Sequence, residues 1–319
     1  MKRIRALSWM CLLPLWLAVC ASACAAAPLP PATAAPAAPA DTAALRRALE
    51  AAVSGYPGIV GIGVRNLKTG EAVSLRGDET FPSASLIKVA VLVALLEEVR
   101  QGRLRLEEPI SLVSRDRVGG SGVLQHLRPG LLLSLEDAAW LMIVVSDNTA
   151  TNLLLDKLDV RSVGAKMEAL GLPHTKIHSK TFRRETSIAV DSSVKYGLGV
   201  STPDETVRLF TLLHEGRAVS PALDSGALAM LRANQDVTKL TRWLPASVAV
   251  AHKSGEVDRA RSDCGILYSP AAPLAVCVMT RENRDTSYAV DNAANRLIAA
   301  VGRAVFRHYN PAAELPPPQ

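Results

Sequence analysis

The chain contains no run of basic residues, although its bases outnumber its acids. Its 319 residues include 36 Lys or Arg and 30 Asp or Glu, for a formal net charge of +6. Three of those bases, Lys2, Arg3 and Arg5, lie in a segment that we expect to be removed, which leaves 33 bases against 30 acids. Proteins that bind nucleic acid concentrate bases so that several phosphates are neutralised together. We therefore expect no nucleic-acid partner.

Cysteine is scarce in the part of the chain that we expect to fold. Three of the five cysteines lie in the N-terminal segment: Cys11, Cys20 and Cys24. The other two, Cys264 and Cys277, lie in apolar, strand-like runs, and a hairpin centred between Pro270 and Ala271 would place them opposite each other. In an oxidising compartment they could form a disulfide. Two buried thiols fit at least as well, because directly opposed strand positions often strain a disulfide.

The sequence also lacks a complete metal or nucleotide motif. His174 and His178 have the spacing of zinc ligands on a helix, but a glycine and a proline precede them and no third ligand is evident. Gly61 and Gly63 lack the third glycine and the following helix of a nucleotide-binding loop. We expect no metal ion and no other cofactor.

The N-terminus has the features of an export signal. Three bases precede an apolar stretch, residues 6–19, and the small residues Ala21-Ser22-Ala23 follow it. This stretch is too short to remain as a membrane-spanning helix. We expect residues 1–24 to be a signal peptide and the protein to be periplasmic or extracellular. A lipoprotein signal is an open alternative, in which Cys24 is acylated and attaches the protein to a membrane.

The rest of the chain divides by composition. Residues 25–40 are almost entirely Ala and Pro without charge, which predicts an extended linker. Residues 310–319 form a second, Pro-rich tail. Between them, residues 41–309 contain no comparable linker, and the chain is 49% hydrophobic, so we expect one folded domain with a real core.

Periodicity predicts a mixed fold. The helices are expected over residues 42–54, 85–101, 134–158, 203–214 and 288–307. The strands are expected over residues 58–66, 71–76, 247–254, 263–269 and 274–281. Because strands at both ends enclose the helices, we expect an α/β (α+β) domain with a five-stranded antiparallel sheet built from both chain ends, flanked by helices and carrying a helical insertion.

The first chemical motif is Ser85-Leu86-Ile87-Lys88, at the start of a long apolar helix. Residues three apart on a helix share a face, so the Lys88 amine can approach the Ser85 hydroxyl. A serine needs a base to become a nucleophile at neutral pH, and a desolvated amine can act as one. The pattern alone is weak, because Ser-x-x-Lys arises by chance about once in a chain of this length.

The second motif, Ser146-Asp147-Asn148, interrupts an apolar segment. Three consecutive polar residues would be costly in a core, so they indicate a site unless they simply cap a helix. The third motif, Lys253-Ser254-Gly255, ends a strand. A cation and a hydroxyl there can hold a carboxylate, and the glycine lets the backbone approach a substrate, although an ordinary turn would have the same composition.

In this order, the three motifs resemble the signature of penicillin-recognising serine enzymes, specifically class A β-lactamases. The resemblance covers nearly all of residues 41–309 and implies their transpeptidase-like fold. It departs from the family at Ser254, where Thr is usual and the hydroxyl is kept.

The resemblance also implies a role for each motif residue. Ser85 would be the nucleophile, with Lys88 assisting removal of its proton. Ser146 would relay a proton to the leaving nitrogen, and Asn148 would bind the side-chain amide of the substrate. The remaining group would bind the substrate carboxylate and the oxyanion: Lys253, Ser254, Gly255 and the backbone of Glu256. Asp147 would orient its loop.

Hydrolysis of the acyl-enzyme has the weakest support in the sequence. The family activates a water with the glutamate of a Glu-x-x-Leu-Asn loop, and the only comparable segment begins at Glu185 and has Ala189 where the amide should be. The resemblance therefore implies Glu185 as the base. A solvated loop charge is the alternative, and without the amide the acyl-enzyme could be long-lived.

Three functions remain open. The favoured one is an exported serine β-lactamase acting through an acyl-enzyme on Ser85. The rivals are a D-alanyl peptidase or other acyl hydrolase of the cell envelope, and a non-catalytic protein that binds penicillin or peptide. The expected partner is a small β-lactam or a cell-wall peptide, and we expect a monomer.

Overall fold

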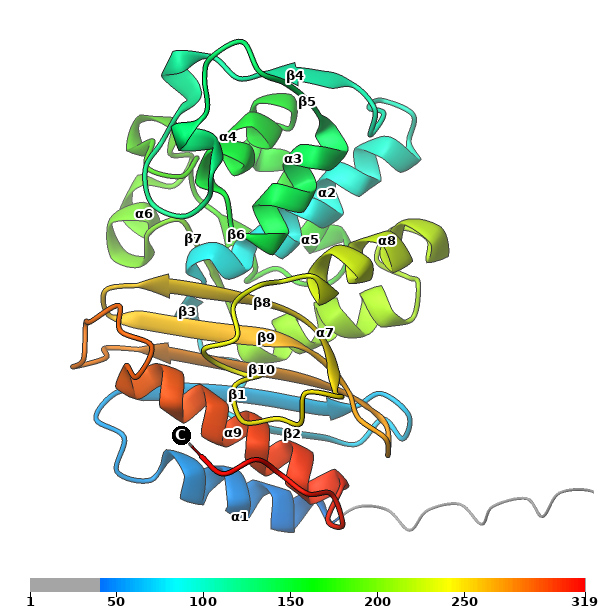
Figure 1. The fold of residues 1–319 in the computed structure, drawn as a ribbon, viewed down its shortest axis with the longest axis vertical. Coiled ribbons are helices and arrows are strands. Elements are labelled where there is room, and N and C mark those ends of the chain that lie inside the picture. Colours follow the sequence, from blue (N-terminus) through cyan, green and yellow to red (C-terminus); the bar gives the residue numbers. More distant parts are fainter. Residues whose placement is uncertain (1–40, 319) are drawn as a thin grey trace, which may run out of the picture. The chain divides into compact units, whose positions relative to one another are not determined.

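The computed structural model describes residues 41–318. The predicted signal peptide with Cys24 and the Ala/Pro linker lie outside the described residues. Within them, a five-stranded sheet has the order β2-β1-β10-β9-β8, and every neighbouring pair is antiparallel. Its strands are β1 (Ile59–Asn66), β2 (Ala72–Leu75), β8 (Ala249–Val257), β9 (Ala260–Tyr268) and β10 (Pro273–Arg281). The predicted sheet from both chain ends is therefore confirmed (Figure 1).

Helices cover both faces of the sheet. On β10, Val276 and Val278 belong to a core shared with α1 (Thr42–Val53) and α9 (Ala293–Tyr309). The alternate residues Cys277 and Met279 belong to a second core, shared with the helices that cover the other face. This period of two is what a strand buried on both sides requires. The covering helices of the second face are α7 (Pro203–His214) and α8 (Pro221–Arg232).

The helical insertion lies beyond the β8 edge of the sheet (Figure 1). Its central helix, α2 (Lys88–Arg100), is buried on nearly all sides over its first ten residues. The other elements of this part are α3 (Leu135–Val144), α4 (Asn148–Lys157), α5 (Val160–Ala169) and α6 (Val190–Tyr196). Short strands join them: β3 (Phe81–Pro82), β4 (Pro109–Ser111), β5 (Leu132–Ser134), β6 (Lys176–Ile177) and β7 (Gly199–Ser201).

One predicted helix is wrong in a way that matters for the site. The sequence pattern predicted a single helix over residues 134–158, whereas the structure has α3 and α4 with a break between them. Ser146 has φ of 55°, which no α-helix contains, and Asp147 then caps α4 by accepting a hydrogen bond from the Ala150 amide. The break places the second motif in a loop between two helices.

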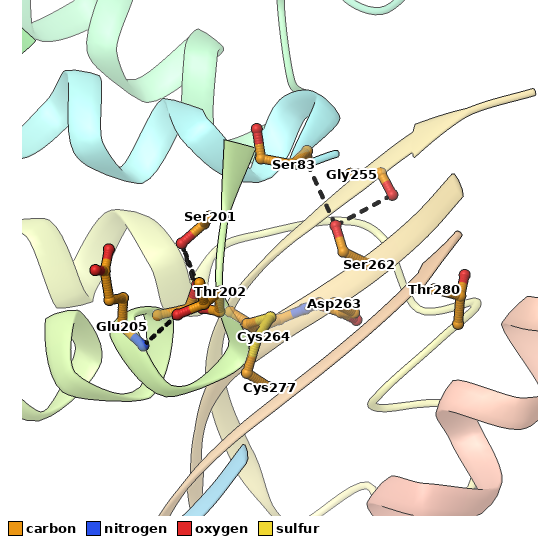
Figure 2. The surroundings of a disulfide bond; sticks show 12 residues. Ser83, Ser201, Thr202, Glu205, Gly255, Ser262, Asp263, Cys264, Cys277 and Thr280 are labelled. Atoms are coloured by element: carbon orange, nitrogen blue, oxygen red, sulfur yellow. Dashed lines mark hydrogen bonds and ion pairs between the residues drawn. A yellow bond between two sulfur atoms is a disulfide. The ribbon is translucent and has the colours of Figure 1, made fainter. Parts of the chain in front are cut away.

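The β9–β10 hairpin has the predicted centre. Cys264 is paired directly with Cys277 in the register, and the two form a disulfide with 4.0 Å between their Cα atoms (Figure 2). The predicted C-terminal tail is in contact with the domain, because Ala313 and Leu315 pack against the core between the sheet and α9. No helix within residues 41–318 has the length and hydropathy needed to span a bilayer.

Candidate active site

Ser85 lies in a short 3-10 turn, η1 (Ala84–Ile87), that leads directly into α2. The preceding residue, Ala84, has φ of 45°, in the left-handed region that residues with a Cβ rarely adopt. Such a conformation costs of order 1–3 kcal/mol and persists only where its surroundings impose it. The turn therefore has to be held from outside.

The end of strand β8 holds this turn. A Cβ atom on Gly255 would lie 2.3 Å from the Ser83 carbonyl oxygen and 2.8 Å from the Leu86 amide nitrogen. Only a glycine allows this approach. From β9, the Ser262 hydroxyl lies 3.4 Å from the carbonyl oxygens of both Ser83 and Gly255 (Figure 2). The first and third motifs are thus packed directly against each other.

Lys88 connects the first motif to the second. Its amine is fully buried and donates hydrogen bonds to the Ser146 carbonyl oxygen at 2.7 Å, the Ser146 hydroxyl at 3.1 Å and Asn148 Oδ1 at 2.8 Å. Burial lowers the pKa of Lys88 well below its usual value, and the Lys253 cation lowers it further, against an opposing effect of Asp147. The three donated hydrogen bonds need the three protons of an ammonium, and the lowered pKa eases the loss of one of them, which would leave an amine that can accept a proton.

Lys253 reaches the same hydroxyl from strand β8. Lys253 is 1% exposed, and its amine donates to Ser146 Oγ at 3.1 Å and to the Ser254 carbonyl oxygen at 2.8 Å. Burial lowers the pKa of Lys253 to about 8, although neighbouring carboxylates raise it. The Ser146 hydroxyl therefore lies between two amines, and all three motifs converge on it.

The other two residues of the second motif fix its loop. Asp147 is buried and accepts hydrogen bonds from the backbone amides of Val123 at 2.6 Å and Leu124 at 2.8 Å, besides capping α4. Asn148 donates to the Gly119 carbonyl oxygen at 3.0 Å while it accepts from Lys88. These contacts attach the loop of residues 118–124 to the site and agree with the orienting role expected for Asp147.

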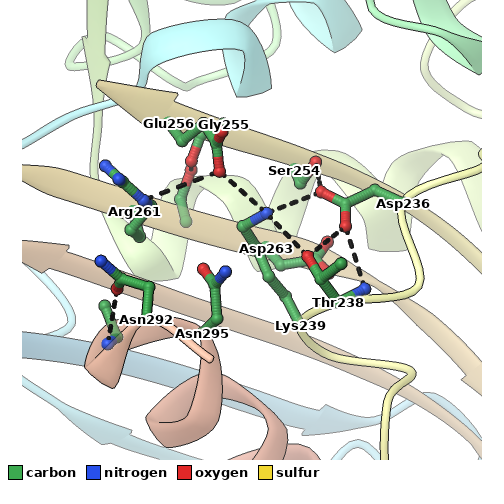
Figure 3. A network of polar contacts seen from close by, with 12 residues as sticks. Asp236, Thr238, Lys239, Ser254, Gly255, Glu256, Arg261, Asp263, Asn292 and Asn295 are labelled. Atoms are coloured by element: carbon green, nitrogen blue, oxygen red, sulfur yellow. Dashed lines mark hydrogen bonds and ion pairs between the residues drawn. The ribbon is translucent and has the colours of Figure 1, made fainter. Parts of the chain in front are cut away.

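A network of charged side chains contacts the Ser254 hydroxyl (Figure 3). The Ser254 hydroxyl donates to Asp236 Oδ2 at 2.6 Å, and the same oxygen accepts from the buried Lys239 amine at 2.7 Å. Burial raises the pKa of Asp236, but Lys239 and the hydrogen bonds from Ser254 and Thr238 outweigh it and hold that pKa far below its usual range. Sequence reasoning missed Asp236 and Lys239, because neither belongs to a motif or follows a periodic pattern.

Glu256 closes this network on the exposed side. Its carboxylate lies 3.1 Å from the Lys239 amine and 3.6 Å from the guanidinium of Arg261, which is fully buried. Lys239 thus has a carboxylate on each side, Asp236 and Glu256, and their charges raise its pKa against the effect of burial.

The structure does not bring Glu185 to this cluster. Glu185 lies in a 3-10 turn, η4 (Arg184–Thr186), and its side chain is 67% exposed, 3.9 Å from Arg183. The loop is attached to the site through Thr181, whose backbone exchanges hydrogen bonds of 2.8 and 3.0 Å with the Asn152 side chain. The carboxylate whose charge acts on the Lys88 amine is Asp147, which is already engaged in its loop.

The two histidines with zinc-like spacing have other partners. His174 Nδ1 lies 2.7 Å from a Glu205 carboxylate oxygen, and His178 Nδ1 lies 3.1 Å from the Gly197 carbonyl oxygen. Among residues 41–318, no group of three or more His, Cys, Asp or Glu side chains is placed to hold a metal ion.

Comparison with known proteins gives one consistent result. The profile of a family described as "Beta-lactamase enzyme family" matches residues 44–309. Beta-lactamase CARB-4 from Pseudomonas aeruginosa is 27% identical over 270 residues, which cover 83% of this chain and 88% of that protein.

Two solved structures extend the likeness to three dimensions. A β-lactamase from Sphaerobacter thermophilus DSM 20745 aligns with a TM-score of 0.76 at 30% identity, over 86% of this chain and 100% of that one. The structure of PBP-A aligns with a TM-score of 0.74 at 25% identity, over 84% of this chain and 96% of the other.

Proposed function

The chain belongs to the β-lactamase enzyme family and is a serine hydrolase, and we propose that Ser85 opens the lactam ring and becomes acylated. The observation that carries this proposal is the convergence of the three motifs on one hydroxyl. Ser146 Oγ lies 3.1 Å from the amines of both Lys88 and Lys253, although these lysines are 165 positions apart in the sequence. Burying two amines around one hydroxyl costs desolvation free energy, and nothing in a purely structural loop would require that cost.

The acylation step requires a deprotonated Lys88, which the lowered pKa of this amine favours. The neutral amine of Lys88 accepts the proton of the Ser85 hydroxyl as its oxygen attacks the lactam carbonyl carbon. The carbonyl oxygen becomes an oxyanion, held by the backbone N–H groups of Ser85 and Glu256. When the C–N bond breaks, Ser146 donates its proton to the lactam nitrogen and receives one from Lys88. The products are an ester on Ser85 and a free ring amine.

The binding groups take their roles from the same geometry. The Asn148 amide, fixed by Lys88 and Gly119, presents its remaining N–H to the side-chain amide of the substrate. The Lys253 amine supplies the charge for the substrate carboxylate, and the close packing of Gly255 against the Ser83–Leu86 backbone holds the nucleophile's turn beside it.

Glu185 is left out of the acylation step because its side chain points to solvent. Its assignment as the base that hydrolyses the ester is what the resemblance implies, and the exposure of its side chain favours the alternative, a solvated loop charge. This placement, together with Ala189, favours a second candidate function, a D-alanyl peptidase or other envelope acyl hydrolase with the same nucleophile. The likeness to PBP-A, of which an L158E mutant forms an acyl-enzyme with penicillin G, is in line with it.

Turnover of nitrocefin by the full chain separates these functions. Steady hydrolysis identifies the lactamase, and a single burst equal to the enzyme concentration identifies the slow acyl hydrolase. A Ser85→Ala variant must lose the covalent adduct in mass spectrometry, whereas Ser187→Ala, in the neighbouring loop, must keep it. Absence of any adduct on the unaltered chain would leave only a binding protein.

We also propose that the protein is exported and acts outside the cytoplasm. The basic and apolar N-terminal residues and the family support this. Intact-mass measurement on protein from its native host tests it, because cleavage removes about 24 residues and acylation of Cys24 adds the mass of the lipid.

A further inference from the structure

The charges around Ser254 are unusually balanced for a site that should attract an anion. Three cations, Lys253, Lys239 and Arg261, lie here, all of them buried. The carboxylates of Asp236 and Glu256 already engage two of the cations. A substrate carboxylate placed beside Ser254 therefore meets a region whose positive charge is largely neutralised by these two carboxylates.

The Ser254 hydroxyl is committed as well. A hydroxyl has one hydrogen to donate, and Ser254 donates it to Asp236 at 2.6 Å. In this arrangement the oxygen offers only lone pairs to an incoming carboxylate, which needs donors. Of the three buried cations, Lys253 is the one with which neither Asp236 nor Glu256 forms an ion pair, so it remains as a charged donor toward the substrate.

Glu256 lies next to this position. Side chains two apart on a strand share a face, so Ser254 and Glu256 project from the same side of β8, about 7 Å apart along the strand. Of the two carboxylates that contact Lys239, Glu256 has the more exposed side chain, at 37% against 24% for Asp236. It is the group of this network best placed to meet the carboxylate of a ligand.

We propose that Glu256 determines substrate specificity by occupying, with its own carboxylate, the cationic position that a substrate carboxylate would otherwise use. Its side chain binds Lys239 and Arg261 and repels a second anion, so the site disfavours acyl donors with a carboxylate beside the reacting bond. Donors with a neutral group there are not penalised. This inference rests on the proposed function, since it concerns the substrate class of the same site, and it adds a side-chain role to a residue whose backbone N–H serves the oxyanion.

The test compares an acid with its neutral ester on a protein that cannot react. In the full chain carrying Ser85→Ala, equilibrium affinities are measured for penicillin G and for penicillin G methyl ester, with and without Glu256→Gln. Glutamine keeps an oxygen for Lys239 but removes the charge. We expect Glu256→Gln to raise the affinity for the acid 5- to 30-fold and to change the affinity for the ester less than 2-fold.

Two further variants serve as controls for this result. Glu256→Ala must shift the affinities in the same direction, and thermal unfolding confirms that each variant is folded. The control is Glu168→Gln, which removes the charge of a glutamate on α5 whose carboxylate lies 3.1 Å from the Lys176 amine. It must change neither affinity.

An acid affinity that is unchanged or weaker in Glu256→Gln, or equal gains for acid and ester, overturns the inference. Failure of the proposed function is visible separately, as the lack of an ester on Ser85 in the unaltered chain.

Discussion

The acylating side of the site and the loop that contains Glu185 are held in different ways. On the acylating side, Lys88 and Lys253 are buried and belong to α2 and β8, whose backbones are fixed by the core. The loop is attached through the Asn152 clasp, by which we mean the two hydrogen bonds between the Asn152 side chain and the Thr181 backbone. The carboxylate of Glu185 is exposed. The groups that we propose to form the acyl-enzyme are therefore held by the core, whereas the glutamate expected to assist its hydrolysis lies on an exposed loop.

Removing the buried Lys88 amine should have the largest effect, and it should act on acylation. Lys88→Met should slow acylation by about 10²- to 10⁴-fold, because the group that accepts the Ser85 proton is lost. Single-turnover mass spectrometry of the adduct measures this. Lys166→Met, which removes a partly buried ion pair with Glu97 at 3.0 Å on α5, is the matched control and should leave acylation unchanged. Comparable losses in both variants would mean that general destabilisation explains the effect.

The pH dependence of lactam affinity should reveal the contribution of the second buried amine, Lys253. Lys253 holds an anion only while it is protonated, and its pKa is lowered to about 8 by burial. Affinity for a lactam with a carboxylate should therefore be present below pH 8 and fall up to about 10-fold for each pH unit above it. The methyl ester should lack this decline. Affinity measurements on Ser85→Ala between pH 6 and 10 decide the point, and parallel curves for acid and ester would remove Lys253 as the carboxylate ligand.

Much of the acylating side could be predicted from the sequence because its determinants are local. Helix α7 begins and ends where predicted, since Thr202 caps it and Pro203 occupies its first turn. The three motifs could be found because each is contiguous. The network of Asp236 and Lys239 could not, because it joins β8 through a segment without regular structure. The left-handed conformation of Ser146, which splits the predicted helix, is imposed by long-range contacts that no periodicity reveals.

The loop should respond to the loss of its clasp. Asn152→Ala removes two hydrogen bonds to the Thr181 backbone, which should lower the free energy of unfolding by about 1–3 kcal/mol. Because the clasp contacts no motif residue, acylation should change less than hydrolysis of the ester. Stopped-flow measurement of both rates tests this. Asn66→Ala, which loses bonds to the turn after β1, is the control and should leave the ratio of the two rates unaltered.

The smallest effect is expected at Glu185 itself. A general base must come within hydrogen-bond reach of the water that it activates, and removing one costs about 10²- to 10⁴-fold. The Glu185 side chain is two-thirds exposed and faces Arg183, so Glu185→Gln should change hydrolysis of the acyl-enzyme less than 2-fold, as should Glu215→Gln, which loses an exposed ion pair with Arg217. A loss of 100-fold confined to Glu185→Gln would show instead that the loop closes over the ester and that the difference between the two sides disappears once substrate is bound.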